Sequence, residues 1–177
     1  MKTMPKNQRL DFDQIIDKYG QKLFNLLLRL TGNYHLAQDL SQDVLLIAYK
    51  EYPKFRGDSD VFTWIYRIAI NHHRKQIRKL RLKSLLGFDE VPSDVLSTAP
   101  DSDPAEQDEQ NRTVAKAVAL LPLEFKETIV LHYFQDQSCE KIAGIMGCSE
   151  GTVKSRLWRA RKILARKLKS FVSETGV

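Results

Sequence analysis

The chain has 177 residues, enough for one ordinary domain or two small ones, and its 42% hydrophobic content can supply a core. A formal net charge of +6 favours a polyanionic partner, either nucleic acid or an anionic membrane. No run of about 18 apolar residues occurs, and the first residues lack the apolar stretch of a signal peptide. These features exclude a transmembrane helix, and we expect a cytoplasmic protein.

Helical periodicity dominates residues 10–83. One apolar stripe spans residues 12–30 and a second spans residues 37–48. A loop around Pro53 precedes a third helix, predicted over about residues 60–82. No segment alternates with a period of two, so we predict an all-α fold.

The third predicted helix begins with aromatic side chains and ends with cations. The aromatic residues are Phe62, Trp64 and Tyr66, and the cations are Arg67, Arg74, Lys75, Arg78, Lys79, Arg81 and Lys83. Aromatic faces stack on unpaired bases with about 1–3 kcal/mol per base, while cations bind the phosphates. The helix therefore suits a strand that has left its duplex. The alternatives are that the aromatic side chains are core, the better interpretation for Phe62, and that the cations offset the helix dipole.

The second apolar stripe carries a polar side. Asp39, Gln42 and Asp43 share it, and Leu46 and Tyr49 follow one turn later. An acidic and amide surface flanked by apolar residues can dock a partner, although most such surfaces are only solvated.

An acidic segment separates the two halves of the chain. Residues 84–110 contain no Lys or Arg, and they include Pro92, Pro100 and Pro104. Their acids are Asp89, Glu90, Asp94, Asp101, Asp103, Glu106, Asp108 and Glu109. This composition is typical of a linker, and a coil of about 27 residues can extend to about 90 Å. We therefore predict two small helical domains, residues 10–83 and 111–171, on a flexible acidic linker.

The C-terminal half contains a helix-turn-helix pattern from Ser138 to Leu168. Ser138 and Ser149 can each cap a helix, and Gly147 allows the positive φ that ends the first one. The second helix has an apolar stripe made by Val153, Leu157, Ala160, Leu164 and Leu168. Such a second helix fits the major groove of DNA.

The charge of that second helix has a single sign over most of its length. After Glu150, Glu174 is the only acid in the rest of the chain. A merely solvated surface normally mixes both signs, so the pattern favours DNA contact over solvation alone.

The two cysteines, Cys139 and Cys148, flank the first helix of this motif. A helix of that length separates them too far for a disulfide, and no metal-ligand spacing surrounds them. We interpret both as packing residues, and we expect no metal and no cofactor.

Three segments together resemble sigma factors of the extracytoplasmic-function (ECF) branch of the sigma-70 family. QDLSQDVLLIAYK (38–50) resembles the segment that grips the clamp helices of core RNA polymerase. FRGDSDVFTWIYRIAIN (55–71) resembles the promoter-melting segment, and GCSEGTVKSRLWRARKIL (147–164) resembles the helix that reads the −35 element. The resemblance implies a non-enzymatic protein that directs core polymerase to promoters through −10 and −35 recognition and −10 melting.

The resemblance also implies site residues. At the polymerase contact it places Asp39, Gln42, Asp43, Leu46 and Tyr49. At the −10 element it places Lys54, Phe55, Arg56, Trp64, Arg67, Asn71, Arg74 and Arg78. At the −35 element it places Thr152, Lys154, Ser155, Arg156 and Arg159. Core RNA polymerase, promoter DNA and an anti-sigma factor are the implied partners.

Two positions depart from the family pattern. Gln38 replaces an acid of the polymerase contact, and Lys75 stands where many members have Asp. Lys75 makes the individual −10 contacts uncertain.

Three other functions fit the sequence less well. An ordinary helix-turn-helix regulator would carry a ligand-binding or phosphate-accepting domain, of which the N-terminal half has no sign. A nuclease using His72 and His73 is disfavoured because adjacent helical residues point about 100° apart. A peripheral membrane protein would need a broad exposed apolar face on its basic helix.

Overall fold

The computed structural model describes residues 11–86 and 109–175, and every element in these two ranges is helical. The N-terminal range contains α1 (Phe12–Thr31), α2 (Tyr34–Glu51), the short 3-10 turn η2 (Tyr52–Lys54) and α3 (Val61–Leu85). The C-terminal range contains α5 (Glu109–Ala119), α6 (Leu123–Ile129), η3 (Val130–Phe134), α7 (Cys139–Met146) and α8 (Glu150–Thr175). The predicted all-α class is confirmed.

Helices α1 to α3 form the N-terminal domain around an apolar centre. Its fully buried side chains include Ile15, Leu23, Leu26, Leu27, Ala37, Val44, Ile65 and Ile70. Asp11 and Gln14 form a capping box at the start of α1, and Gly32 ends it with a φ of 69°. Asn33 then caps α2, because its side chain accepts a hydrogen bond from the Leu36 amide at 2.9 Å. The two predicted apolar stripes, on α1 and α2, pack against each other in this core.

The structure moves two predicted boundaries. Helix α3 continues to Leu85 and α5 begins at Glu109, so both ends of the predicted linker are helical. The rest of that linker lies outside the described residues. Before the helix-turn-helix, α6 continues directly into η3, a turn of π-helix.

Helices α5 to α8 form the C-terminal domain. Its core joins α6 and η3 to the helix-turn-helix pair through Ile129, Leu131, Ile142, Ile145, Val153, Leu157 and Ala160. Leu164 and Leu168 are only half-buried, so the stripe predicted for α8 is deepest in its first half. None of the described helices is long and apolar enough to cross a membrane.

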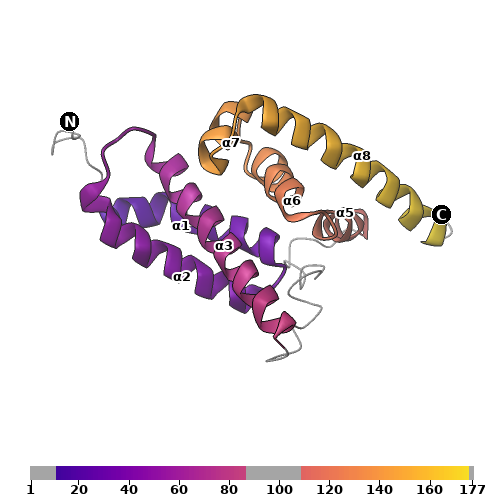
Figure 1. The fold of residues 1–177 in the computed structure, drawn as a ribbon, viewed down its shortest axis with the longest axis horizontal. Helices are drawn as coiled ribbons and strands as arrows, with labels where there is room; N and C mark the ends of the chain where they lie inside the picture. The colour runs from indigo at the N-terminus through magenta and orange to yellow at the C-terminus, as the bar shows by residue number, and fades with distance from the viewer. Residues whose placement is uncertain (1–10, 87–108, 176–177) are drawn as a thin grey trace.

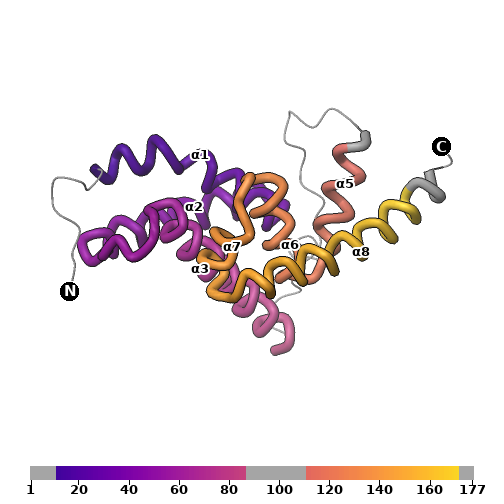
Figure 2. Tube along the Cα trace, turned by 90° about the horizontal axis from the view of Figure 1, so that it is seen from above, coloured from indigo at the N-terminus to yellow at the C-terminus, as the bar shows by residue number. Residues whose placement is uncertain are grey.

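The two domains pack directly against each other (Figures 1 and 2). Helix α3 lies against α7, and α1 lies against η3. The Arg29 guanidinium stacks 4.1 Å from the centre of the Phe134 ring. The Tyr66 hydroxyl donates to Gln135 Oε1 at 2.7 Å. The sequence predicted two domains on a linker and gave no sign of this contact.

Candidate nucleic-acid interface

The helix-turn-helix is built as its sequence predicts. The Ser138 hydroxyl accepts from the Lys141 amide at 3.2 Å, which caps α7. Gly147 has a φ of 66° and ends α7. The Ser149 hydroxyl accepts from the Thr152 amide at 3.2 Å and caps α8. These contacts fix the turn and present the first turns of α8 outward.

The candidate −35 residues lie along this outward side of α8. Lys154, Ser155 and Arg159 are exposed, while Thr152 and Arg156 are half-buried. Lys154 pairs with Glu150 at 2.7 Å, and this hydrogen bond raises the pKa of Lys154 above its ordinary value. Arg156 donates to Glu124 Oε2 of α6 at 3.1 Å. Thr152, Ser155 and Arg159 therefore share the outward side of α8, and Lys154 and Arg156 lie on its two flanks.

Trp158 belongs to the same surface and was missed by the sequence interpretation. It is 56% exposed and points away from the buried Val153, Leu157 and Ala160. The Lys162 ammonium lies 3.8 Å from the centre of its ring. A tryptophan off the apolar stripe, three residues after Ser155, was the signal that could have revealed it.

The candidate −10 residues divide into an aromatic cluster and a row of polar residues. Phe55 is buried, with 6% of its surface exposed, and its ring centre lies 4.9 Å from that of Trp64. Tyr52 completes this cluster beneath the loop, whereas the neighbouring Lys54 and Arg56 are exposed. The aromatic cluster therefore anchors the loop that carries these two cations.

The polar row follows α3. Asn71 and Arg78 are exposed. Arg67 instead donates to the Gly144 carbonyl of α7, with Nη2 at 2.6 Å. Arg74 donates to both carboxylate oxygens of Glu127 in α6, at 2.7 and 3.0 Å. Two candidate DNA contacts of the first domain are thus held by the second domain.

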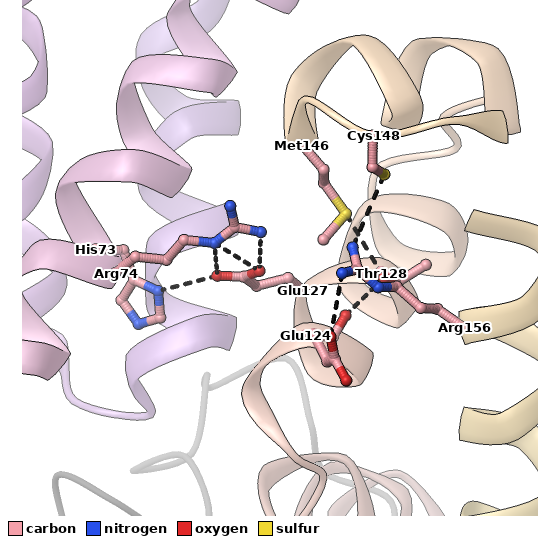
Figure 3. A network of polar contacts seen from close by, with 8 residues as sticks. All are labelled: His73, Arg74, Glu124, Glu127, Thr128, Met146, Cys148 and Arg156. Carbon is pink, nitrogen blue, oxygen red and sulfur yellow. Dashed lines mark hydrogen bonds and ion pairs between the residues drawn. The ribbon is translucent and has the colours of Figure 1, made fainter. Parts of the chain in front are cut away.

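Figure 3 shows that side chains of α6 bond both to α3 of the N-terminal domain and to α8 of the helix-turn-helix. Glu127 is fully buried and accepts hydrogen bonds from Arg74. These hydrogen bonds raise the pKa of the Arg74 guanidinium above its ordinary value. His73 is also buried, with Nδ1 3.9 Å from Glu127 Oε1. Nearly one turn earlier on α6, Glu124 bonds Arg156 of the helix-turn-helix. Sequence reasoning missed Glu127, although a lone acid in the run FKETIVL signals a buried partner.

The candidate polymerase contact occupies one exposed face of α2. Asp39, Gln42 and Asp43 are exposed, and Leu46 and Tyr49 are 52% and 61% exposed. Asp43 Oδ2 lies 3.1 Å from His72 Nε2 of α3. His72 and His73 therefore face different helices, as the argument against a shared catalytic site predicted. Within the described ranges no cluster of three or more His, Cys, Asp and Glu residues could hold a metal.

Comparison with known proteins agrees with this arrangement. Residues 15–82 match the family Sigma-70 region 2, and residues 111–164 match Sigma-70, region 4. The RNA polymerase sigma-H factor of Pseudomonas aeruginosa is 30% identical, over 98% of this chain and 94% of that protein. The chain belongs to the ECF branch of the sigma-70 family. As a sigma factor, it serves promoter-directed transcription initiation.

Other relatives support the same family. The ECF RNA polymerase sigma-E factor of Haemophilus influenzae is 32% identical to this sigma factor over 89% of the chain and 87% of that protein. In a solved structure, the sigma factor RpoE from Bartonella quintana, in complex with the anti-sigma factor NepR, superposes with a TM-score of 0.76. It shares 28% identity, and the match covers 90% of this chain and 97% of that one.

Proposed function

We propose that this sigma factor brings core RNA polymerase to promoters through two surfaces, one for the −35 element and one for the −10 element. The observation that carries the proposal is the start of α8. There Lys154, Ser155 and Arg159 project outward from a helix that Ser149 fixes in a helix-turn-helix. A helix so placed inserts its N-terminal residues into the major groove.

At the −35 element, α8 reads duplex DNA. Thr152, Ser155 and Arg159 follow one another at intervals of three or four residues, so they reach the same groove. Arg159 suits guanine edges, while Lys154 and Arg156 bind phosphates. Trp158, on the same surface, adds an apolar contact for a thymine methyl group or a sugar.

At the −10 element, the loop after α2 and the exposed side of α3 hold an unpaired strand. Lys54 and Arg56 bind phosphates from a loop anchored by Phe55 and Trp64. Extruding one base requires a few kcal/mol, which hydrogen bonds and stacking in the pocket offset. Asn71 supplies donors and an acceptor for a base edge, and Arg67, Arg74 and Arg78 hold the adjacent backbone.

The exposed face of α2 binds core polymerase. Asp39, Gln42 and Asp43 offer charge and hydrogen bonds, and Leu46 and Tyr49 offer apolar surface that is more than half exposed among the described residues. An anti-sigma factor, as found with the Bartonella quintana relative, is the proposed inhibitor. The protein acts in the cytoplasm, beside polymerase and DNA, without chemistry of its own.

Run-off transcription with purified bacterial core polymerase and a pool of promoter fragments tests the proposal. Protein-dependent initiation at discrete sites is the expected result, with one conserved element near −35 and another near −10. 2-Aminopurine placed in the −10 element then reports melting, which Asn71→Ala should slow while leaving closed-complex formation intact. DNA binding without any gain in initiation would instead indicate an ordinary helix-turn-helix regulator.

A further inference from the structure

The exposed face of α2 that is proposed to bind polymerase is held at both of its edges by neighbouring helices. At the edge toward α3, Asp43 Oδ2 lies 3.1 Å from His72 Nε2. At the edge toward α1, the ring centre of Tyr49 lies 5.2 Å from that of Phe12, with the two rings edge to face. Leu46, which is 52% exposed, lies between these edges. One polar contact and one aromatic contact therefore frame the face.

The contact between Asp43 and His72 has a defined direction. A carboxylate only accepts hydrogen bonds, so His72 Nε2 carries the proton and donates to Oδ2. A neutral ring in this tautomer leaves the negative charge of the carboxylate in place. The Asp43 side chain is 60% exposed, whereas that of His72 is only 22% exposed. The bond therefore fixes one carboxylate oxygen, Oδ2, and leaves the other, Oδ1, for a partner molecule.

Helix α3 gives His72 a rigid base. It packs along α2 (Figure 1), and Ala69, one turn before His72 on the same side of α3, is fully buried. A side chain that projects from a packed helix holds its partner more precisely than one on a loop. The ring of His72 can therefore fix the orientation of the Asp43 carboxylate.

The charge on α2 works against a fixed orientation of Asp43. Asp39 lies one turn earlier on the same side of α2, and both side chains are exposed. Like charges four residues apart on a helix repel each other. Of the residues that the structure describes, only His72 bonds to the Asp43 carboxylate. Without that bond the carboxylate would turn freely, and a partner would have to immobilise it on binding.

His72 lies apart from the proposed −10 residues of α3. Asn71, Arg74 and Arg78 are each at least about 100° around the helix from His72. A substitution at His72 therefore changes the support of the α2 face and leaves those three side chains in place.

We infer that His72 is a positioning residue for the polymerase contact. Its Nε2–H holds Oδ2 of Asp43, so that Oδ1 is presented to a cationic or other hydrogen-bond-donating side chain of core polymerase. This inference rests on the proposed function, because it takes Asp43 as part of the polymerase contact. It adds a residue of α3 that acts on polymerase binding only through Asp43.

Three substitutions of His72 test the hydrogen bond through its geometry. His72→Gln keeps an amide donor near the position of Nε2, whereas the shorter His72→Asn has its donor near the position of Nδ1. His72→Leu removes the donor and keeps much of the volume. Fluorescence anisotropy of each labelled, full-length variant measures its affinity for purified core polymerase. We expect His72→Leu and His72→Asn to weaken binding at least about threefold, and His72→Gln to stay within about 1.5-fold of the wild type.

Asp43→Asn and the double variant His72→Leu with Asp43→Asn complete a double-mutant cycle. Asp43→Asn should weaken binding at least as much as His72→Leu does. The double variant should bind as Asp43→Asn does, because His72 acts only through Asp43. In run-off transcription, His72→Leu should need more protein for half-maximal initiation and still reach the plateau of the wild type, which separates a binding defect from a melting defect.

The cycle separates failure of the inference from failure of the proposed function. A loss for Asp43→Asn with none for His72→Leu would overturn the positioning role and leave the polymerase contact standing. Equal losses for His72→Gln and His72→Leu would show that the hydrogen bond is not the cause. Unchanged binding by Asp43→Asn would remove Asp43 from the contact, and the positioning role would fail with it.

Nuclear magnetic resonance of the free protein examines the pair without polymerase. Long-range ¹H–¹⁵N spectra of the His72 ring should show the proton on Nε2, and Asp43→Asn should shift both ring nitrogens. A ring that does not respond to Asp43→Asn would overturn the inference on its own. If the wild type does not bind core polymerase, the proposed function fails and the positioning role with it, whereas these spectra still decide whether the Asp43–His72 pair exists.

Discussion

The two candidate DNA surfaces hold their cations in opposite ways. On α8, Lys154 pairs with Glu150 and Arg156 with Glu124, both within the C-terminal domain and both with a carboxylate that is about half exposed. On α3, Arg67 and Arg74 bond to the other domain, across 77 and 53 residues of sequence. The first arrangement keeps the ion pairs within one domain, whereas the second joins the two domains.

This difference separates two physical roles of the same residue type. An exposed ion pair contributes little, so DNA can exchange its partner at small cost. A pair with a fully buried carboxylate is different, because removing one partner leaves a charge that water cannot reach. Exchange of the partner therefore costs little for the cations of α8 and much for Arg74.

Removing one arginine from each surface gives the largest contrast. Arg74→Met leaves Glu127 buried without its partner and should lower the free energy of unfolding by about 3–5 kcal/mol. Arg156→Met removes a pair whose carboxylate, Glu124, is 52% exposed and can be hydrated, and it should change the free energy of unfolding by less than about 1 kcal/mol. Urea unfolding followed by circular dichroism measures both values.

The control for this contrast is the double variant Arg74→Met with Glu127→Leu. Replacing both members of a buried pair by apolar side chains should recover most of the lost stability. Equal effects of the two single variants would show that Glu127 is not isolated from water as the structure has it.

Two lysines of the C-terminal domain, Lys126 and Lys154, should differ in what they contribute to the pH dependence of stability. Burial lowers the pKa of Lys126 to about 8, from 10.5 when unfolded. Between these values the unfolded state binds more protons, so the free energy of unfolding should rise with pH. From about pH 8 to about pH 9.5 we expect a gain of about 1.5 kcal/mol, measured by urea titration.

Lys126→Met should abolish that rise, whereas Lys154→Met, at a fully exposed lysine, should keep it. The scan stops near pH 9.5 because burial raises the pKa of Tyr66, which makes stability fall at higher pH. A rise that survives in Lys126→Met would assign it to another group.

The sequence predicted what is local and missed what is long-range. The apolar stripes of α1 and α2, the stop at Gly147 and the caps at Ser138 and Ser149 follow from periodicity and from hydrogen bonds between near neighbours, and the structure has each of them. The contact between the domains leaves no local pattern in the sequence, because Arg74 and Glu127 lie 53 residues apart and belong to different helices. Phe55, which the resemblance assigned to the −10 contact, packs its ring against Trp64, nine residues later in the chain, and is 6% exposed.

A substitution at the cap of α8 tests whether the start of this helix is held by hydrogen bonds between near neighbours. Ser149→Ala removes the acceptor for the Thr152 amide and should lower stability by about 1 kcal/mol. Ser155→Ala, at an exposed position inside α8, should change it by less than about 0.5 kcal/mol. Thermal unfolding of the two variants measures the difference, and a larger effect of Ser155→Ala would contradict a cap-based account.

The smallest expected effect is on the salt dependence of DNA binding, and it compares the two surfaces most directly. For the free protein bound to a −35 duplex, Arg159→Ala should reduce the slope of log affinity against log salt by about one, because one phosphate or base contact is lost. Arg74→Met should leave that slope unchanged, since Glu127 already holds Arg74 in the free protein. Arg112→Ala, an exposed cation on α5, is the charge control. Fluorescence anisotropy across a salt series measures the slope for all three variants. A reduced slope for Arg74→Met would mean that DNA contacts Arg74 in the free protein despite Glu127.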